Sequence, residues 1–174
     1  LPETLGLASA KPFELLDGRV AIGAASGLLF ILNQVGELQQ TISIGEQSYI
    51  HGGVQLLDGS VLLSTVTKAS ASIFKIFPSG EIVKIYAGKD GSFIPPTVLS
   101  DGHIVLNKFA DEDETPALVF LNPDGKMDFG IENFSPNSFQ AVTELSHGRV
   151  VIGGRTLGSD AQPAVAEIDI GTKK

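Results

Sequence analysis

The segment Leu57-Asp58-Gly59-Ser60-Val61 occurs in four versions along this chain of 174 residues. The other three are Leu16-Asp17-Gly18-Arg19-Val20, Ser100-Asp101-Gly102-His103-Ile104 and Ser146-His147-Gly148-Arg149-Val150. Counted from glycine to glycine, successive versions are separated by 41, 43 and 46 residues. A second glycine turn follows each version, at Val35-Gly36-Glu37, Ser79-Gly80-Glu81, Asp124-Gly125-Lys126 and Gly171-Thr172-Lys173. A nearly fixed period of this length is typical of a repeat architecture, so we interpret the chain as four repeats.

Asp-Gly or Ser-Gly between two apolar runs predicts a tight β-hairpin, because glycine accepts the positive φ that such turns need. We therefore expect positive φ at Gly18, Gly59, Gly102 and Gly125. The strand after the first turn is apolar at consecutive positions, as in Val61-Leu62-Leu63, which predicts packing on both of its faces. The strand after the second turn is more polar, as in Glu81-Ile82-Val83-Lys84, which is typical of an exposed edge. Each repeat thus predicts four antiparallel strands, and no long helical periodicity appears.

A family resemblance follows from these motifs. The pattern apolar-x-x-Asp-Gly-x-Val-x-apolar is followed by apolar-x-apolar-Asn-Pro-Asp-Gly, which is clearest from Val119 to Gly125. It resembles the repeats of bacterial β-propellers of the NHL, gluconolactonase-like and quinoprotein-like kinds. The resemblance covers nearly the whole chain and implies an all-β fold of β-propeller-type repeats, with four blades of four antiparallel strands. The tryptophan-rich signatures of WD40 and quinoprotein repeats are absent, because the chain has no tryptophan.

The repeats suggest one domain. We expect residues 1–174 to form a single propeller or partial propeller, with repeats at about 9–53, 54–96, 97–141 and 142–174. The last repeat lacks a fourth strand, which residues 1–8 could supply as a closing outer strand. Alternatively, the repeats are part of a larger propeller or are completed by another copy. An array with open ends leaves sheet faces uncovered, so we expect self-association if the propeller is incomplete.

Composition argues against several classes of partner. The 12 Lys and Arg against 20 Asp and Glu give a formal net charge of −8, which disfavours nucleic acid and anionic membrane surfaces. The apolar runs are far too short for membrane insertion. The absence of cysteine excludes a disulfide framework, a thiolate metal site and a cysteine nucleophile. The chain begins at Leu1 rather than at methionine, which suggests a processed or excised polypeptide, and we favour a bacterial protein in an extracellular or periplasmic location.

The loops between the second and third strands carry the differences between repeats, since they span residues 24–27, 67–71, 110–116 and 155–163. In a propeller these loops share one end with the loops that join successive repeats. We call this end the loop face and the opposite end, formed by the tight turns, the turn face. Variable loops on a rigid scaffold commonly carry binding residues, so we predict a site on the loop face. Its candidate residues are Tyr49, His51, Asp111, Glu112, Asp113, Glu114, Arg155 and Asp160.

The most distinctive local motif is the run of four consecutive acidic residues Asp111–Glu114. Four carboxylates could ligate Ca²⁺, but the run lacks the alternate spacing and the glycine of an EF-hand loop, and a solvated loop is the simpler interpretation. His51, His103 and His147 fall on different faces, so a shared zinc site is not expected. No nucleophile elbow, phosphate loop or metalloprotease motif is present. We therefore assign no catalytic residue, metal ligand or cofactor, with calcium as the alternative.

Three functions are compatible with these observations. The first is a binding or interaction module whose loop face binds a protein, a peptide or a glycan. The second is a gluconolactonase-like metal-dependent hydrolase, or a fragment of one. For that function the resemblance implies Glu, Asn and Asp ligands in a central tunnel, where Glu14 and Glu144 are the best candidates. The third is a structural repeat of a larger surface protein. Because catalytic motifs are lacking, we favour the binding module over an enzyme.

Overall fold

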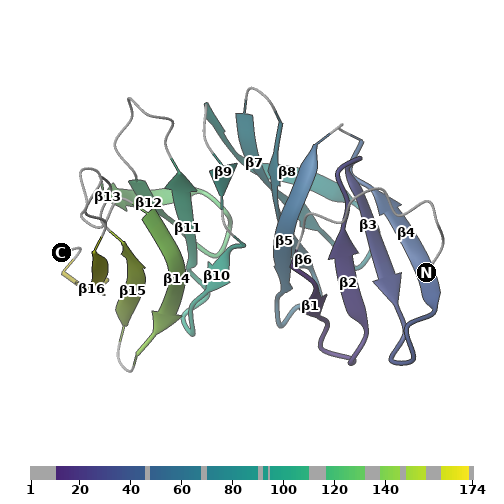
Figure 1. Cartoon of the computed structure of the whole chain (residues 1–174), viewed down its shortest axis with the longest axis horizontal. Coiled ribbons are helices and arrows are strands. Elements are labelled where there is room, and N and C mark those ends of the chain that lie inside the picture. Colours follow the sequence, from purple (N-terminus) through teal and green to yellow (C-terminus); the bar gives the residue numbers. More distant parts are fainter. Residues whose placement is uncertain are drawn as a thin grey trace. The chain divides into compact units, whose positions relative to one another are not determined.

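A computed structural model describes residues 11–45, 48–67, 70–89, 92–93, 95–109, 117–131, 138–145, 148–155 and 162–172. The described residues form β-strands and turns without any helix, which confirms the all-β prediction (Figure 1). Accordingly, none of them belongs to a helix long and apolar enough to cross a membrane. Residues 1–8, predicted as a closing outer strand, lie outside the described part of the chain.

The strands form four antiparallel sheets, and in each sheet the strands follow one another in chain order. Sheet 1 contains β1 (Phe13–Glu14), β2 (Val20–Gly23), β3 (Leu28–Leu32) and β4 (Leu38–Ser43). Sheet 2 contains β5 (Tyr49–Gln55), β6 (Val61–Val66), β7 (Ser70–Ile76) and β8 (Ile82–Lys89). Sheet 3 contains β10 (Thr97–Val98), β11 (Ile104–Phe109), β12 (Ala117–Leu121) and β13 (Met127–Ile131) in that order. The two-residue strand β9 (Ser92–Phe93) does not belong to this consecutive series of strands. Sheet 4 contains β14 (Ser138–Glu144), β15 (Arg149–Arg155) and β16 (Pro163–Asp169), which are its three strands among the described residues.

The tight turns share one backbone geometry. In the β5–β6 turn, the Gly59 amide donates to the Leu56 carbonyl at 2.9 Å, and the Leu56 amide donates to the Ser60 carbonyl at 2.8 Å. The same pair of bonds recurs in the turns that follow β1, β3, β7, β10 and β12. A short turn closed by a left-handed glycine is a common hairpin connection, and it sets the register of the flanking strands. The predicted positive φ is confirmed, with 82° at Gly18, 83° at Gly59, 87° at Gly102 and 82° at Gly125.

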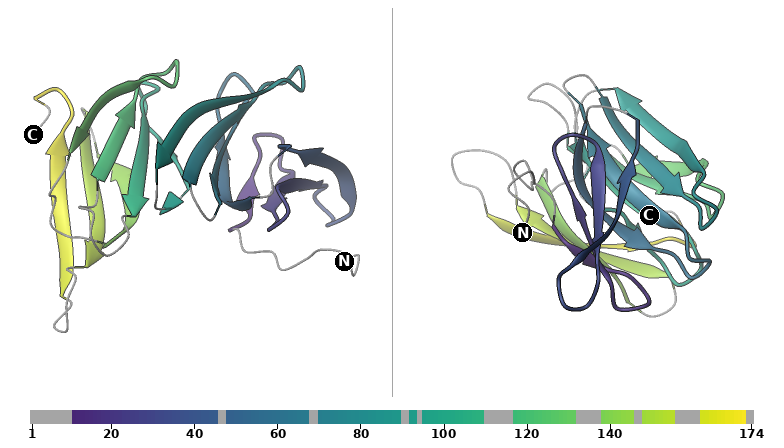
Figure 2. Two further views of the ribbon diagram at one scale, coloured as in Figure 1. Left: turned by 90° about the horizontal axis from the view of Figure 1, so that it is seen from above. Right: turned by 90° about the vertical axis from the view of Figure 1, so that its right-hand side faces the viewer.

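Burial differs between strands as the sequence predicts. Five of the six residues of β6 are buried, so this strand is covered on both faces. By contrast, β4 is exposed at five of its six residues, as expected for an outer edge strand. Figure 2 shows β4 from two further directions, joined to β3 by a tight hairpin at the edge of sheet 1.

The chain divides into two compact units, Leu1–Pro96 and Thr97–Lys174, each with its own apolar core. In the first unit, Leu29 and Ile31 of sheet 1 pack with Leu63 and Phe74 of sheet 2. In the second unit, the corresponding cluster joins sheets 3 and 4. Its members are Leu99, Val105, Leu118, Phe120, Val150, Ile152, Ile168 and Ile170. Each unit is thus a pair of sheets held by aliphatic and aromatic side chains from two facing strand surfaces.

Two predicted repeat boundaries fall inside strands. The sequence-based boundaries lie after residues 53 and 141, whereas β5 begins at Tyr49 and β14 begins at Ser138. Register shifts between Ile50 and Gly52, and between Phe139 and Ala141, interrupt the two-residue alternation in these strands. A prediction based on the two-residue alternation therefore places the start of each of these strands too late in the sequence.

Candidate functional site

Tyr49 lies at the loop end of sheet 2. It is the first residue of β5 and pairs with Val66, the last residue of β6, so it stands beside the start of the variable loop at 67–71. Its side chain is 50% exposed. For this sheet, the structure therefore brings the loop that joins two repeats and a variable loop to the same end.

His51 follows two residues later on β5. It is half-buried, and desolvation by burial lowers the pKa of its imidazole below the ordinary value. Its carbonyl accepts a hydrogen bond from the Lys11 amide at 3.3 Å. Just before β5, the Ser48 hydroxyl is buried without a hydrogen-bond partner among the described residues. Tyr49 and His51 are thus an exposed phenol and a neutral, half-buried imidazole on one strand.

The other candidate residues of the loop face are not gathered with these two. Asp111, Glu112, Asp113, Glu114 and Asp160 lie outside the described residues. Arg155 is described through its backbone, as the last residue of β15, where it pairs with Ser138 and Pro163. A site that combines all eight residues therefore stays a prediction.

A shallow hollow on the turn face of sheet 1 was not expected from the sequence. It encloses about 360 Å³ and is lined by Asp17, Arg19, Asn33, Gln34, Val35 and Gln39. The Arg19 guanidinium donates to the Asp17 carboxylate at 2.8 Å from Nε, and its Nη2 lies 2.8 Å from the same Oδ2 atom. This hydrogen bond is the main reason that the pKa of Asp17 is lowered and the pKa of Arg19 is raised. The signal available in the sequence was an arginine directly after an Asp-Gly turn.

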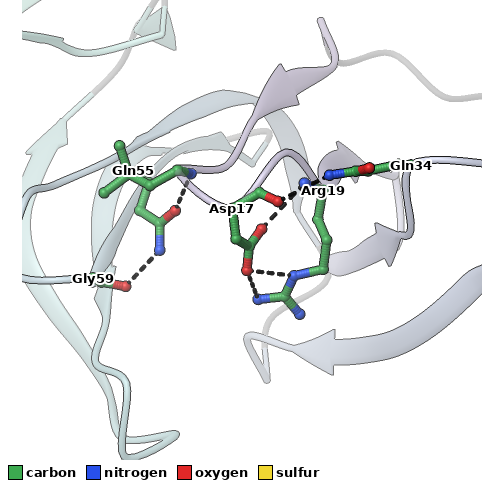
Figure 3. A network of polar contacts seen from close by, with 6 residues as sticks. Asp17, Arg19, Gln34, Gln55 and Gly59 are labelled. Carbon is green, nitrogen blue, oxygen red and sulfur yellow. Dashed lines mark hydrogen bonds and ion pairs between the residues drawn. The ribbon is translucent and has the colours of Figure 1, made fainter.

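Side-chain amides connect the turns of the first unit, as Figure 3 shows. Gln34 donates from Nε2 to the Asp17 carbonyl at 3.3 Å, which joins the β3–β4 turn to the β1–β2 turn. Gln55 accepts from the Leu16 amide at 2.7 Å and donates to the Gly59 carbonyl at 2.9 Å. The Gln55 amide thus links the turn of sheet 1 to the turn of sheet 2, so three of the four tight turns of this unit are joined by side-chain hydrogen bonds.

The two acids considered for a metal-dependent hydrolase lie in different settings. Glu14 is exposed on β1, at the end of the strand nearest the turn face. Glu144 of β14 accepts hydrogen bonds from the Ser100 amide at 2.6 Å and from the Ser100 hydroxyl at 2.7 Å. Among the described residues, no group of three or more His, Asp or Glu is arranged to hold a metal ion. In the described chain Glu144 is therefore a hydrogen-bond acceptor for a turn.

Solved structures share this arrangement of sheets, although no family model and no curated protein sequence matches the chain. Hydrazine synthase from Kuenenia stuttgartiensis has a TM-score of 0.76 at 13% identity, over 91% of this chain and 50% of that one. Virginiamycin B lyase from Staphylococcus aureus has a TM-score of 0.72 at 13% identity, over 98% and 58%. The Dos1 propeller has a TM-score of 0.64 at 13% identity, over 95% and 45%. This chain has the β-propeller repeat fold.

The propeller repeats do not by themselves select a function. The chain spans about half the length of the structures it matches. By name, these include a synthase and a lyase, and also BamB from Moraxella catarrhalis, which matches at 16% identity with a TM-score of 0.59 over 97% of this chain and 52% of that one. At such low identity the similarity concerns the fold alone, so function has to be argued from the residues.

Proposed function

We propose that this chain is a binding module that holds a protein, peptide or glycan partner through the loop face of its propeller repeats. The observation that carries the proposal is the position of Tyr49. A half-exposed tyrosine stands at the loop end of a rigid strand, directly beside a variable loop. Tyrosine offers a large flat surface and one hydroxyl at a low cost in side-chain entropy, which is why it is frequent among binding hot spots.

His51 supports the same assignment. Because burial keeps its imidazole neutral at ordinary pH, it offers one donor and one acceptor rather than a charge. A neutral hydrogen-bonding group two residues from an exposed tyrosine on the same strand suits a peptide backbone or a sugar hydroxyl. The acidic run at 111–114 and the residues Arg155 and Asp160 complete the proposed surface and would select the charge of the partner.

The proposal is tested by selecting ligands from a random peptide library and from a glycan array, and by measuring affinity with variants. We expect Tyr49→Ala to weaken a selected ligand about tenfold or more, which corresponds to at least 1.4 kcal/mol. Charge reversal at Asp111, Glu112, Asp113 and Glu114 should also change affinity for charged ligands. The matched control reverses Glu37, Glu81 and Lys126 in the tight turns and should leave affinity unchanged. If the turn-face variants abolish binding while the loop-face variants retain it, the binding surface is on the turn face.

A further inference from the structure

A free backbone edge runs along the outer strand of sheet 1. This strand, β4, is the last in its sheet (Figure 1), and among the described residues it pairs only with β3. The open edge consists of backbone groups in the plane of the sheet, whereas neighbouring sheets pack on its faces, so packing against another sheet leaves the edge open. Unpaired N–H and C=O groups of this kind form a template for a further extended strand.

The hydrogen bonds beside β4 show which backbone groups form this edge. The Ile44 amide donates to the Gly27 carbonyl at 3.0 Å, so the backbone of Ile44 is directed toward β3. In an antiparallel pair, residues of this kind alternate with residues whose backbone groups point outward. Ile42 is therefore also directed toward β3, whereas Thr41 and Ser43 point their N–H and C=O groups away from the sheet.

The side chains of β4 do not protect this edge. Natural proteins commonly place charged residues, lysine above all, on outer strands, where they prevent the addition of a further strand. The outer strand of sheet 2 contains Lys84 and Lys89, and that of sheet 3 contains Asp128. The sequence of β4 is Leu-Gln-Gln-Thr-Ile-Ser, which has no charge. Among the fourth strands of sheets 1 to 3, β4 is therefore the one best suited to pair with another strand.

The regular part of β4 spans residues 40–43. A register shift beside Ile31 and Leu32 is confined to the start of the strand, before residue 40. Within 40–43, Ile42 is half-buried and packs against the core of the first unit, whereas the other three residues are exposed. The core thus holds this segment in an extended conformation, so the addition of a strand requires little further ordering of β4.

From these observations we propose that β4 of a second copy of this chain pairs antiparallel with β4, so that sheet 1 of both copies becomes one continuous sheet. The side chains along the edge favour this occupant. Outward residues pair with outward residues, which places Thr41 opposite Thr41 or Ser43 of the other copy, and such pairs of hydroxyl side chains stabilise neighbouring strands. Because β4 is uncharged, self-pairing brings no like charges together at the edge, although each chain has a net charge of −8. The contact is isologous, since both copies use the same surface, and it is separate from the loop face.

The first test is the solution mass of the chain, measured by analytical ultracentrifugation over the micromolar range in about 0.15 M salt, which screens the net charge. We expect the mass to rise with concentration from the 18.3 kDa of one chain toward that of a dimer. Thr41→Lys and Ser43→Lys should each weaken association by about tenfold or more, because a charged side chain at the edge has to be desolvated when a strand is added.

Val35→Lys is the matched control and should associate like the unaltered chain. Val35 is 79% exposed in the β3–β4 turn, so this variant adds the same charge to the same hairpin away from the edge. A lysine also reduces the net negative charge, so greater repulsion between copies cannot explain a loss of association. Circular dichroism confirms that each variant is folded. An unaltered chain that stays monomeric throughout, or edge variants that associate like the control, would overturn the proposal.

The second test locates the contact by cross-linking, which is straightforward because the chain has no cysteine of its own. Directly opposite Cα atoms in a hydrogen-bonded antiparallel pair lie about 5.5 Å apart, within the range of a disulfide. Under mild oxidation, Thr41→Cys alone or mixed with Ser43→Cys should therefore form a disulfide-linked dimer, whereas Val35→Cys should remain a single chain. Equal cross-linking of all three positions, or none at the two edge positions, would show that the copies do not meet along β4.

Discussion

Gly59 holds the β5–β6 turn with φ at 83°, a conformation that a β-branched residue adopts only under strain. Gly59→Val should therefore lower the free energy of unfolding by roughly 1–3 kcal/mol. The space around the added Cβ is not the cause, because its nearest neighbour would be Pro78 at an ordinary 3.4 Å. Gly153→Val is the control, since Gly153 has no positive φ and its added Cβ meets nothing within 4 Å. Equal urea midpoints for the two variants would contradict the turn assignment.

His51 makes stability depend on pH in a defined direction. Burial lowers the pKa of its imidazole in the folded state, so the unfolded chain binds the proton more tightly. The free energy of unfolding should therefore fall as pH drops below about 6.5, the ordinary pKa of histidine, and this loss levels off below the folded pKa. Urea titrations at several pH values should show a shallower decline in His51→Gln. The same decline in both proteins would mean that the imidazole is not desolvated.

Prediction of single residues from the sequence succeeded where a backbone conformation strongly favours one residue type. The Asp-Gly pairs identified the positive φ at Gly18 and Gly59 because few other residues fit there. The acidic residues of the loop face could not be placed in this way, since an aspartate in a loop does not demand one backbone conformation as a turn glycine does. The ion pair of Arg19 with Asp17 was also missed, because it depends on a rotamer rather than on the turn.

At the scale of elements, Gln55 connects two hairpins by accepting from Leu16 and donating to Gly59. Gln55→Ala removes both hydrogen bonds, so that the Leu16 amide and the Gly59 carbonyl can bond only to water. We expect a loss of about 1–2 kcal/mol in the free energy of unfolding, together with faster hydrogen exchange at the Leu16 amide. Gln39→Ala on the exposed strand β4 is the control and should change neither quantity. Unaltered exchange at Leu16 in the Gln55 variant would show that the bridge is dispensable.

Substitutions at equivalent positions in different sheets should change the free energy of unfolding by very different amounts. Leu118 is fully buried, so Leu118→Ala should destabilise the protein by about 2–5 kcal/mol through lost burial and a cavity. Val165 at the matching position of sheet 4 is 75% exposed, so Val165→Ala should change the free energy of unfolding by at most about 0.5 kcal/mol at low protein concentration. Thermal unfolding of both variants checks the comparison. A large loss at Val165 in dilute protein would mean that its face is covered within one chain.

Strand identity was predictable because apolar runs and turn glycines alternate regularly. The ends of strands were less so, because Gly52 and Gly53 and the register shift beside them obscure the alternation in β5. The outer strand β4 was correctly predicted to be polar, since it pairs with a strand on one side only and is mostly exposed. The other outer strand of the first unit, β8, retains Ile82, Val83 and Ile85, so edge position alone does not make a strand polar.

At the scale of the whole molecule, the binding proposal requires no metal ion. We expect the melting temperature to be the same in millimolar Ca²⁺ and in EDTA, because only a ligand that prefers the native state stabilises it. Mg²⁺ at the same concentration controls for screening of the net charge of −8. A rise of several degrees specific to Ca²⁺ would instead support a site at Asp111–Glu114 or the metal-dependent hydrolase.

The sequence indicated that inner strands such as β6 are packed on both faces, but it did not show which face meets which. That pairing depends on register, because a shift by one residue exchanges the two faces of a strand. The strand registers assign each residue to a face, and the residues of the two cores then show which faces meet.

In both cores, the face of one sheet that holds the equivalents of Ala21 and Leu29 packs on the face of the next sheet that holds the equivalents of Val20 and Ile22. This shared orientation has a consequence for how such a chain can change its length, because a whole repeat that is duplicated or deleted at the same point of two successive repeats offers the same two surfaces to its neighbours. Each of these tight turns is closed by backbone hydrogen bonds within its own hairpin, and the bonds from Leu16 to Gln55 and from Ser100 to Glu144 join turns to the next sheet at the same place of the repeat. Growth by any fraction of a repeat would instead place a polar edge strand where an aliphatic one is needed. Gene duplication in units of one repeat is therefore the gradual route open to this architecture.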